Sequence, residues 1–162
     1  MKKLIIFAAL SLVLSSCNSA KNNTESKKTE ISKLSDNQLM DKVQSDALKY
    51  FWDFAEPNSL LGRERYHEDE IYPDNDKHVV TTGGSGFGLA TILVGVERGF
   101  IPRKEAVKRL NHIMDFLAKA DRFHGAWPHW INGETGKVVP FGKKDNGGDL
   151  VESAFLTSGI LM

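Results

Sequence analysis

The chain has 162 residues, of which 41% are hydrophobic and 26% charged, with 21 Lys and Arg residues against 21 Asp and Glu residues. These values are typical of a globular protein, and they exclude both wholesale disorder and a polybasic surface for nucleic acid. The single cysteine excludes an internal disulfide and a multi-thiolate metal site.

The first 16 residues are predicted to be an export signal. Two lysines precede an apolar stretch, residues 4–14, which is shorter than the roughly 20 residues of a membrane-spanning helix. Residues 14–17 then read LSSC and resemble the bacterial lipobox, whose cysteine is acylated before cleavage. An ordinary signal peptide with an incidental cysteine is the alternative. We therefore expect a lipoprotein signal peptide over residues 1–16 and lipidation at Cys17.

Residues 17–34 are predicted to be a flexible tether, because they are polar and contain no aromatic residue. A lipid on Cys17 would anchor this tether to a membrane. The residues after Cys17 lack the acidic cluster that marks some lipoproteins exported to the cell surface. The sequence thus favours an outer-membrane lipoprotein that faces the periplasm, with the cell surface as the alternative.

The folded part is predicted to begin with a helix at residue 35. Ser35 and Gln38 form a capping-box pattern, and Pro57 is expected to stop the helix. Met40 is expected in the core together with an apolar stripe at helical spacing, formed by Leu39, Val43, Ala47, Tyr50, Phe51 and Phe54. Residues 58–81 carry many charges and few regular signals, and they predict a long loop.

Two helices are predicted next. Residues 89–96, which follow a glycine-rich stretch at 81–88, are apolar on nearly every side and indicate a buried helix that ends at Arg98, with Gly99 just after its end. Pro102 suits the first turn of a second helix, whose apolar positions recur at helical spacing on one face. Met114 belongs to that face and is expected in the core. The second helix is therefore amphipathic.

A loop of about residues 121–148 leads to a fourth helix that is predicted to start near Asp149. Two short runs around turn residues predict a hairpin within this loop, over residues 130–141. Apolar helices beside an amphipathic one predict an all-α fold, a helical-hairpin array or toroid more than a closed bundle. The last helix is apolar with nothing to cover it, so we expect residues 35–162 to be the N-terminal part of a larger domain.

Three patterns that could bind a phosphate or a metal are incomplete. The glycine-rich residues 83–88 lack the Gly-Lys-Ser/Thr ending of a phosphate-binding loop. Residues 74–76 begin like a calcium loop but lack its glycine at the sixth and its glutamate at the twelfth position. The five histidines show no metal-ligand spacing such as H-E-x-x-H. We therefore expect neither a metal nor a cofactor.

An aromatic loop points to a carbohydrate ligand. Trp127, His129 and Trp130 lie beside Gly and Pro residues, where no regular core face needs two tryptophans. Sugar sites commonly present such aromatic faces, because the C–H surface of a pyranose ring stacks on them while polar neighbours bind its hydroxyls. The alternative for either tryptophan is that its ring only pins the loop to the domain.

Three acidic residues form a second candidate group. Asp149 lies at the expected helix start and Glu152 three residues on, while Asp145 lies in the loop just before. A helix-capping pattern accounts for Asp149 and Glu152 but does not require Asp145. Glycoside hydrolysis uses such carboxylates: one acid protonates the leaving oxygen, and an ionised partner activates water or attacks.

Several motifs in the same order resemble the glucoamylase-like domain family. They are YFWDF at 50–54, TGGSGFGL at 82–89, ERGFI at 97–101, HGAWPHW at 124–130, Thr135-Gly136, and residues 145–152. The likeness runs from about residue 36 to the end. Within the family it is closest to the bacterial endo-β-1,2-glucanases of glycoside hydrolase family 144.

The resemblance implies an (α/α)6 toroid of some twelve helices, of which this chain would hold about a third. It also implies metal-independent hydrolysis of β-linked glucans with inversion, and β-1,2-glucan as the substrate. Asp145, Asp149 and Glu152 match the family's acidic cluster by residue type and spacing, so they are the expected catalytic residues.

The expected substrate-binding residues follow from the same resemblance. The loop that would border the cleft contains Trp127, His129 and Trp130. Arg63 and Glu64, in the first long loop, are weaker candidates for substrate contacts.

The first hypothesis is an exported, monomeric lipoprotein glycosidase, present here as a truncated fragment that is expected to be inactive by itself. A glycan-binding lipoprotein without catalysis and a purely structural helical-repeat lipoprotein are the two alternatives. Loss of turnover on changing Asp149 would separate the first from the second. Loss of sugar affinity on changing the loop tryptophans would exclude the third.

Overall fold

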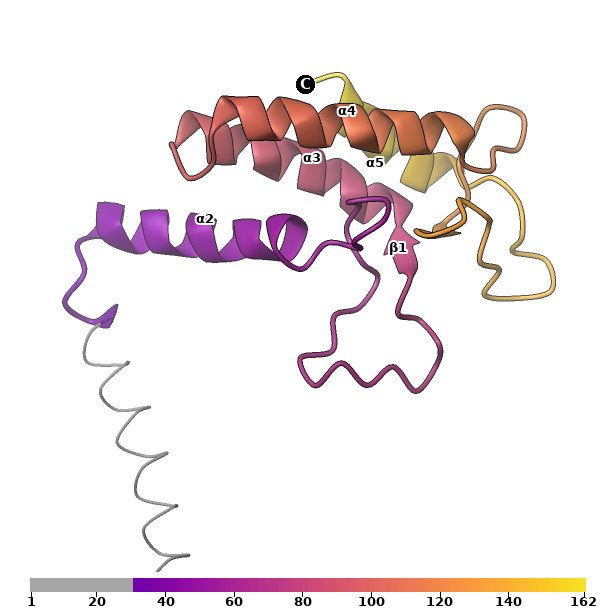
Figure 1. Ribbon diagram of the computed structural model, residues 1–162, viewed down its shortest axis with the longest axis horizontal. Helices are drawn as coiled ribbons and strands as arrows, with labels where there is room; N and C mark the ends of the chain where they lie inside the picture. Colours follow the sequence, from indigo (N-terminus) through magenta and orange to yellow (C-terminus); the bar gives the residue numbers. More distant parts are fainter. Residues whose placement is uncertain (1–30) are drawn as a thin grey trace, which may run out of the picture. The chain divides into compact units, whose positions relative to one another are not determined.

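The computed structural model describes residues 31–162 (Figure 1). The predicted signal peptide, Cys17 and most of the predicted tether lie outside these residues. The chain divides into two compact units, Met1–Val43 and Gln44–Met162. None of the helices in the described part of the chain is long and apolar enough to cross a membrane.

The described part of the first unit holds the start of helix α2 (Asp36–Trp52). Ser35 and Gln38 form the predicted capping box: the Gln38 N–H donates to Ser35 Oγ, and the Ser35 N–H donates to Gln38 Oε1 at 2.9 Å. The prediction that Met40 lies in the core is wrong, because its side chain is 54% exposed. Leu39 and Val43 are also exposed. Within residues 31–43 no second element packs on this stripe, so helical spacing alone does not bury it.

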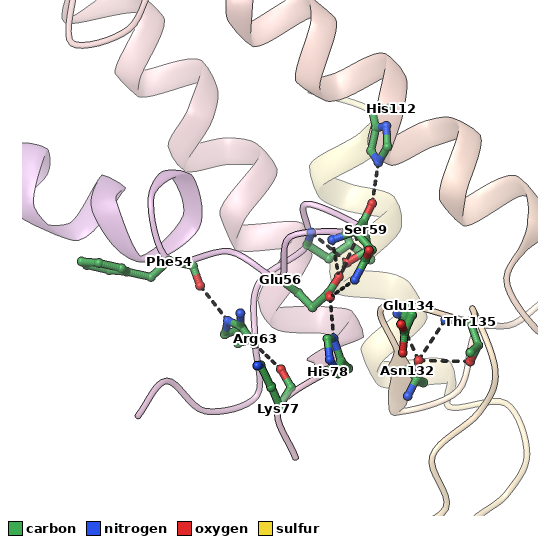
Figure 2. A network of polar contacts seen from close by, with 12 residues as sticks. Phe54, Glu56, Ser59, Arg63, Lys77, His78, His112, Asn132, Glu134 and Thr135 are labelled. Carbon is green, nitrogen blue, oxygen red and sulfur yellow. Dashed lines mark hydrogen bonds and ion pairs between the residues drawn. The ribbon is translucent and has the colours of Figure 1, made fainter. Parts of the chain in front are cut away.

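In the second unit α2 ends at Trp52, five residues before the proline that was expected to stop it. The reason is a tight turn around Glu56, whose backbone N–H donates to Leu61 O and whose carbonyl accepts from the Leu60 N–H. Figure 2 shows how the buried Glu56 carboxylate accepts hydrogen bonds from Ser59 and from His78 Nδ1, the latter at 2.9 Å. This carboxylate ties the end of α2 to the far end of the long loop.

Helices α3 (Thr82–Glu97) and α4 (Arg103–Lys119) confirm that two helices follow the long loop, but α3 also includes the glycine-rich residues 83–88, which were expected to precede it. Gly99 has a φ of +72°, the left-handed conformation expected just beyond the end of α3. On α4, Ala106, Ile113 and Leu117 are buried, and the predicted core residue Met114 packs half-buried against them. The amphipathic assignment of α4 is therefore confirmed.

Helix α5 (Leu150–Ile160) packs extensively on α3, and the two backbones touch through glycines. A Cβ atom at Gly86 would overlap the carbonyl of Phe155, and one at Gly159 would overlap the carbonyl of Gly86. The two apolar helices are only partly covered. Leu156 and Gly159 are the buried residues of α5, while several apolar side chains of both helices, among them Phe87 and Val151, are exposed.

A small sheet of two strands lies next to the start of α3. Strand β1 (Val79–Thr81) pairs antiparallel with β2 (Trp130–Asn132), with Val80 opposite Ile131. Single bridges add Arg63 beside Val80 and Val138 beside Ile131. The second bridge belongs to the predicted hairpin, whereas the pairing with β1 was not predicted. The fold is thus mainly helical with a minor sheet, rather than all-α in the strict sense.

Candidate active site

Asp149 is the N-cap of α5, as its position in the sequence predicts. Its Oδ1 accepts hydrogen bonds from the backbone N–H groups of Val151 (2.9 Å) and Glu152 (3.1 Å). Its own backbone N–H donates to the carbonyl of Trp127 at 2.8 Å. The carboxylate at the helix start is therefore fixed in place and joined to the aromatic loop.

The second oxygen of Asp149 pairs with a histidine from that loop. His129 Nδ1 lies 3.0 Å from Asp149 Oδ2. The backbone N–H of Glu152, with further help from His129 and the Val151 N–H, lowers the pKa of Asp149 despite partial burial. Asp149 is thus an ionised carboxylate at neutral pH, suited to accept a hydrogen bond from a hydroxyl group or a water molecule.

Two hydroxyls hold the backbone of the aromatic loop. Thr82 Oγ1, at the start of α3, donates to Pro128 O at 2.6 Å, and the Thr82 N–H donates to His129 O at 3.1 Å. From α5, Ser153 Oγ accepts from the Trp127 N–H at 2.9 Å and donates to Trp127 O. Sequence reasoning missed Thr82 and Ser153. Their places in the first turns of two helices are the only signal that could have indicated them.

Glu152 contacts helix α3 and not the pocket of the other two acidic residues of its group. Its Oε2 accepts a 2.8 Å hydrogen bond from the backbone N–H of Gly83, in the first turn of α3. It does not line the pocket that holds Asp145 and Asp149. The structure therefore joins two of the three predicted carboxylates and places the third at a contact between helices.

That pocket has a volume of about 110 Å³. Its wall is formed by His129, Phe141, Lys144, Asp145, Gly147, Gly148 and Asp149. Asp145 is exposed, in a turn where its backbone N–H donates to Gly142 O. Two carboxylates, a lysine and two aromatic rings thus surround one small open space.

The two tryptophans of the loop have different surroundings. Trp127 packs against the core, its Nε1 lies 3.3 Å from Leu117 O, and the Arg122 guanidinium lies over its ring. This geometry favours the interpretation that Trp127 pins the loop. Trp130 instead lies 5.3 Å from the ring of His129 and 5.0 Å from that of Phe141, so it belongs to the aromatic wall next to the pocket.

Arg63 and Glu64 lie elsewhere, at the small sheet. Arg63 is only 7% exposed, and its guanidinium donates to the backbone carbonyls of Phe54 and Lys77 (Figure 2). Glu64 is half-buried, and its backbone N–H donates to Val79 O. Neither side chain lines the pocket beside Asp149. Arg63 holds the long loop together in this structure.

Among residues 31–162 no three or more His, Cys, Asp or Glu side chains are grouped so that they could hold a metal ion. The chemistry that the described pocket offers is that of carboxylates, an imidazole and a lysine.

Comparisons with known proteins identify homologues of part of the chain. The chain is 53% identical over 129 residues to an exo β-1,2-glucooligosaccharide sophorohydrolase (non-reducing end) of Parabacteroides distasonis. A solved endo-β-1,2-glucanase of Chitinophaga pinensis, in complex with sophorotriose and glucose, matches with a TM-score of 0.77 at 59% identity. A proposed glucoamylase of Bacteroides caccae matches with the same TM-score at 61% identity. No family model matches the chain.

These matches cover 78–79% of the chain. The chain spans only 17% of the sophorohydrolase and 31% of each of the two solved chains. Over the matched part, its homologues are thus β-1,2-glucan hydrolases and glucoamylase-like proteins.

Proposed function

We propose that this homologue of β-1,2-glucan hydrolases is part of a glycoside hydrolase that cleaves β-linked glucans, with β-1,2-glucan as its substrate. The observation that carries the proposal is the Asp149–His129 pair, which shares a pocket with Asp145 and an exposed aromatic ring. The homologues named above supply the substrate class, since their names specify β-1,2-linked glucans.

Within this proposal Asp149 is the proton acceptor. Hydrogen bonds from two backbone N–H groups and from His129 keep it ionised, and an ionised carboxylate can orient a water molecule and take its proton as that water attacks the sugar. A general acid needs the opposite environment, one that raises the pKa of a carboxyl. We therefore assign the role of general acid to a residue other than Asp149. We assign Asp145 to the binding of substrate hydroxyls or water beside Asp149.

The finer architecture is part of the proposal. We infer that the described helices belong to an (α/α)6 toroid, supported by the likeness to glucoamylase-like structures and by the close packing of α3 on α5. We also propose an inverting, metal-independent mechanism. It requires about 6.5–9.5 Å between the acid and the base, which leaves room for the attacking water.

The proposed location of the protein follows from the lipobox at residues 14–17. Acylation of Cys17 would anchor a monomeric hydrolase to the outer membrane, facing the periplasm. Oligosaccharides that enter the periplasm would then be its substrates.

The test is release of reducing sugar from linear β-1,2-glucan. It is done with the 162-residue chain and with the longest form that its gene encodes, each checked for folding by circular dichroism. Activity is expected in the longest form. Because asparagine also caps helices well, Asp149→Asn keeps the fold and is expected to lower turnover about 10²–10⁴-fold.

The matched control is Asp74→Asn, at a carboxylate that is 76% exposed in the long loop and does not line the pocket. It is expected to retain full turnover. Near-normal turnover of a folded Asp149→Asn variant would contradict the assigned role. Sugar binding without any hydrolysis in the wild type would replace the proposal with a glycan-binding protein.

A further inference from the structure

Phe141 is an aromatic residue of the pocket that sequence reasoning did not single out. Its side chain is 53% exposed, although its ring forms part of the wall beside Asp145 and Asp149. A lone exposed phenylalanine is common on protein surfaces and needs no explanation. This ring does need an explanation, because it shares a pocket wall with two carboxylates.

The ring is held by its neighbours. Its centroid lies 5.0 Å from the Trp130 ring and 5.1 Å from the His129 ring, at interplanar angles of 59° and 62°. Trp130 is fixed in strand β2, and His129 is fixed by Asp149 and Thr82. Both neighbouring rings contact the Phe141 ring at a tilt and not face to face, so they limit its rotation from two sides. The ring is thus preorganised, which lowers the entropy lost when a ligand binds to it.

The polar groups of the pocket indicate the chemistry of that ligand. Asp145 and Asp149 accept hydrogen bonds, and Lys144 donates them. Two carboxylates against one ammonium group disfavour an anionic ligand such as a phosphate ester. A neutral ligand with an apolar face and a rim of hydroxyls fits both the ring and the carboxylates, and a glucosyl residue has that form.

We propose that Phe141 is the stacking platform for one glucosyl ring of the bound glucan, and that Asp145 and Lys144 bind the hydroxyls of that ring. This inference rests on the proposed function, because it places the substrate of that reaction. It adds a binding residue outside the acidic cluster and the two tryptophans.

The experiment measures binding of sophorotriose by titration calorimetry, and KM and kcat on linear β-1,2-glucan, with the longest form that the gene encodes. Phe141→Leu keeps apolar volume but removes the ring face. It is expected to raise Kd and KM about tenfold, the effect of one stacking contact, while kcat changes less than threefold. Phe141→Trp restores a ring face and is expected to keep both constants near those of the wild type.

The matched control is Phe54→Leu. Phe54 is also an exposed phenylalanine in contact with another ring, that of Tyr66 at 4.6 Å, and it does not line this pocket. It is expected to leave Kd and KM unchanged. Should Phe141→Leu fail to fold, Phe141→Met tests the same loss of a ring face.

The stacking role of Phe141 and the proposed hydrolase function are contradicted by different results. Wild-type Kd and KM in a folded Phe141→Leu variant, with hydrolysis intact, would overturn the platform and leave the proposed function standing. A folded wild type that neither binds sophorotriose nor hydrolyses the glucan would overturn both.

Discussion

The carboxylate of Glu152 on α5 accepts a 2.8 Å hydrogen bond from the backbone N–H of Gly83 on α3. The first N–H groups of a helix have no partner within it, and a negative charge is favourable there. A Cβ atom at residue 83 would lie 2.5 Å from Glu152 Oε2, so the glycine makes room for the carboxylate. One residue of the acidic cluster thereby joins the two helices that border the candidate site.

Replacing Glu152 is expected to affect stability in a graded way. Glu152→Ala leaves the Gly83 N–H without its acceptor and should lower the free energy of unfolding by about 1–3 kcal/mol. Glu152→Gln keeps an acceptor oxygen and loses only the charge at the helix start, so it should cost about 0.3–1 kcal/mol. Urea denaturation followed by circular dichroism measures both values.

The same glutamine variant also decides whether Glu152 takes part in catalysis. If its role is to join α3 and α5, Glu152→Gln should keep turnover within about tenfold of the wild type. A general acid or base at this position would instead cost about 10²–10⁴-fold. Equal stability of the alanine and glutamine variants would show that the hydrogen bond to Gly83 contributes nothing.

Thr82 is expected to act on catalysis through His129. Thr82→Val keeps the shape of the buried side chain but removes the hydroxyl that donates to Pro128 O. The loop that carries His129 should loosen, and kcat/KM should fall about tenfold, since small displacements of catalytic groups are costly. Thr82→Ser keeps the hydroxyl and should stay within about threefold of the wild type.

Both Thr82 variants are expected to be less stable, because the first loses a hydrogen bond and the second a buried methyl group. Stability therefore does not separate them, and activity does. Equal kcat/KM values for the two variants at a temperature where both are folded would exclude a positioning role for the hydroxyl.

Much of the helical part of the fold could be predicted from the sequence because its signals are local. The capping box at Ser35, the glycine after α3, the amphipathic spacing of α4 and the N-cap at Asp149 are all found as predicted. Each depends on residues within about one helical turn, so no knowledge of the tertiary structure is needed.

Non-local contacts were missed. Strand β1 is only three residues long, and its partner β2 follows about fifty residues later, so no periodic pattern marks it. Helical spacing predicted burial of Leu39 and Val43, but burial needs a second surface that the spacing does not supply. The early end of α2 depends on hydrogen bonds of Glu56 to the loop beyond it.

The residues of the candidate site were predicted by residue type, and their catalytic roles stay a prediction. Asp145, Asp149 and His129 share one pocket, whereas Glu152 contacts α3. No sequence rule pairs His129 with Asp149, because the contact joins a loop to a helix start twenty residues away. Phe141 was missed for the same reason: one phenylalanine in a loop forms no pattern.

The contact between α3 and α5 is expected to tolerate no side chain at Gly86. A methyl group there would overlap the carbonyl of Phe155, a backbone atom that cannot move without shifting α5. Gly86→Ala should therefore destabilise the protein by about 3 kcal/mol, at the upper end of overpacking costs. The melting temperature and urea denaturation are the measurements.

Gly147 supplies the matched control for that substitution. A Cβ atom at Gly147 would have nothing within 4 Å, so Gly147→Ala should change stability by less than about 0.5 kcal/mol. Similar costs for the two substitutions would mean that general effects of replacing glycine, and not helix contact, determine the result.

The Glu56 network is expected to make stability depend on pH in the acid range. Burial by itself would raise the pKa of Glu56, but hydrogen bonds from Ser59, His78 and Asn58 outweigh it and lower the pKa below the ordinary 4.5. A carboxyl with a lowered pKa in the folded state contributes stability that is fully present above about pH 4.5. That stability is lost as the pH falls through the folded-state value.

Glu56→Gln removes the group that titrates. In the wild type Ser59 and His78 donate hydrogen bonds to the carboxylate oxygens of residue 56. In the variant the amide NH2 group would replace one of these oxygens and face donors instead of accepting from them. At pH 7 the variant should be at least about 2 kcal/mol less stable than the wild type, because hydrogen bonds to a charged group are lost. As the pH falls below 4.5 the wild type loses its advantage progressively, so the difference between the two unfolding free energies should shrink. Urea denaturation at pH 7, 5 and 3.5 measures this difference in unfolding free energy. Asp74→Asn, at an exposed carboxylate, controls for the effect of surface charge.

A difference in unfolding free energy that stays constant over this pH range would mean that the pKa of Glu56 does not change on folding. Linkage requires the difference to shrink as the carboxylate is protonated.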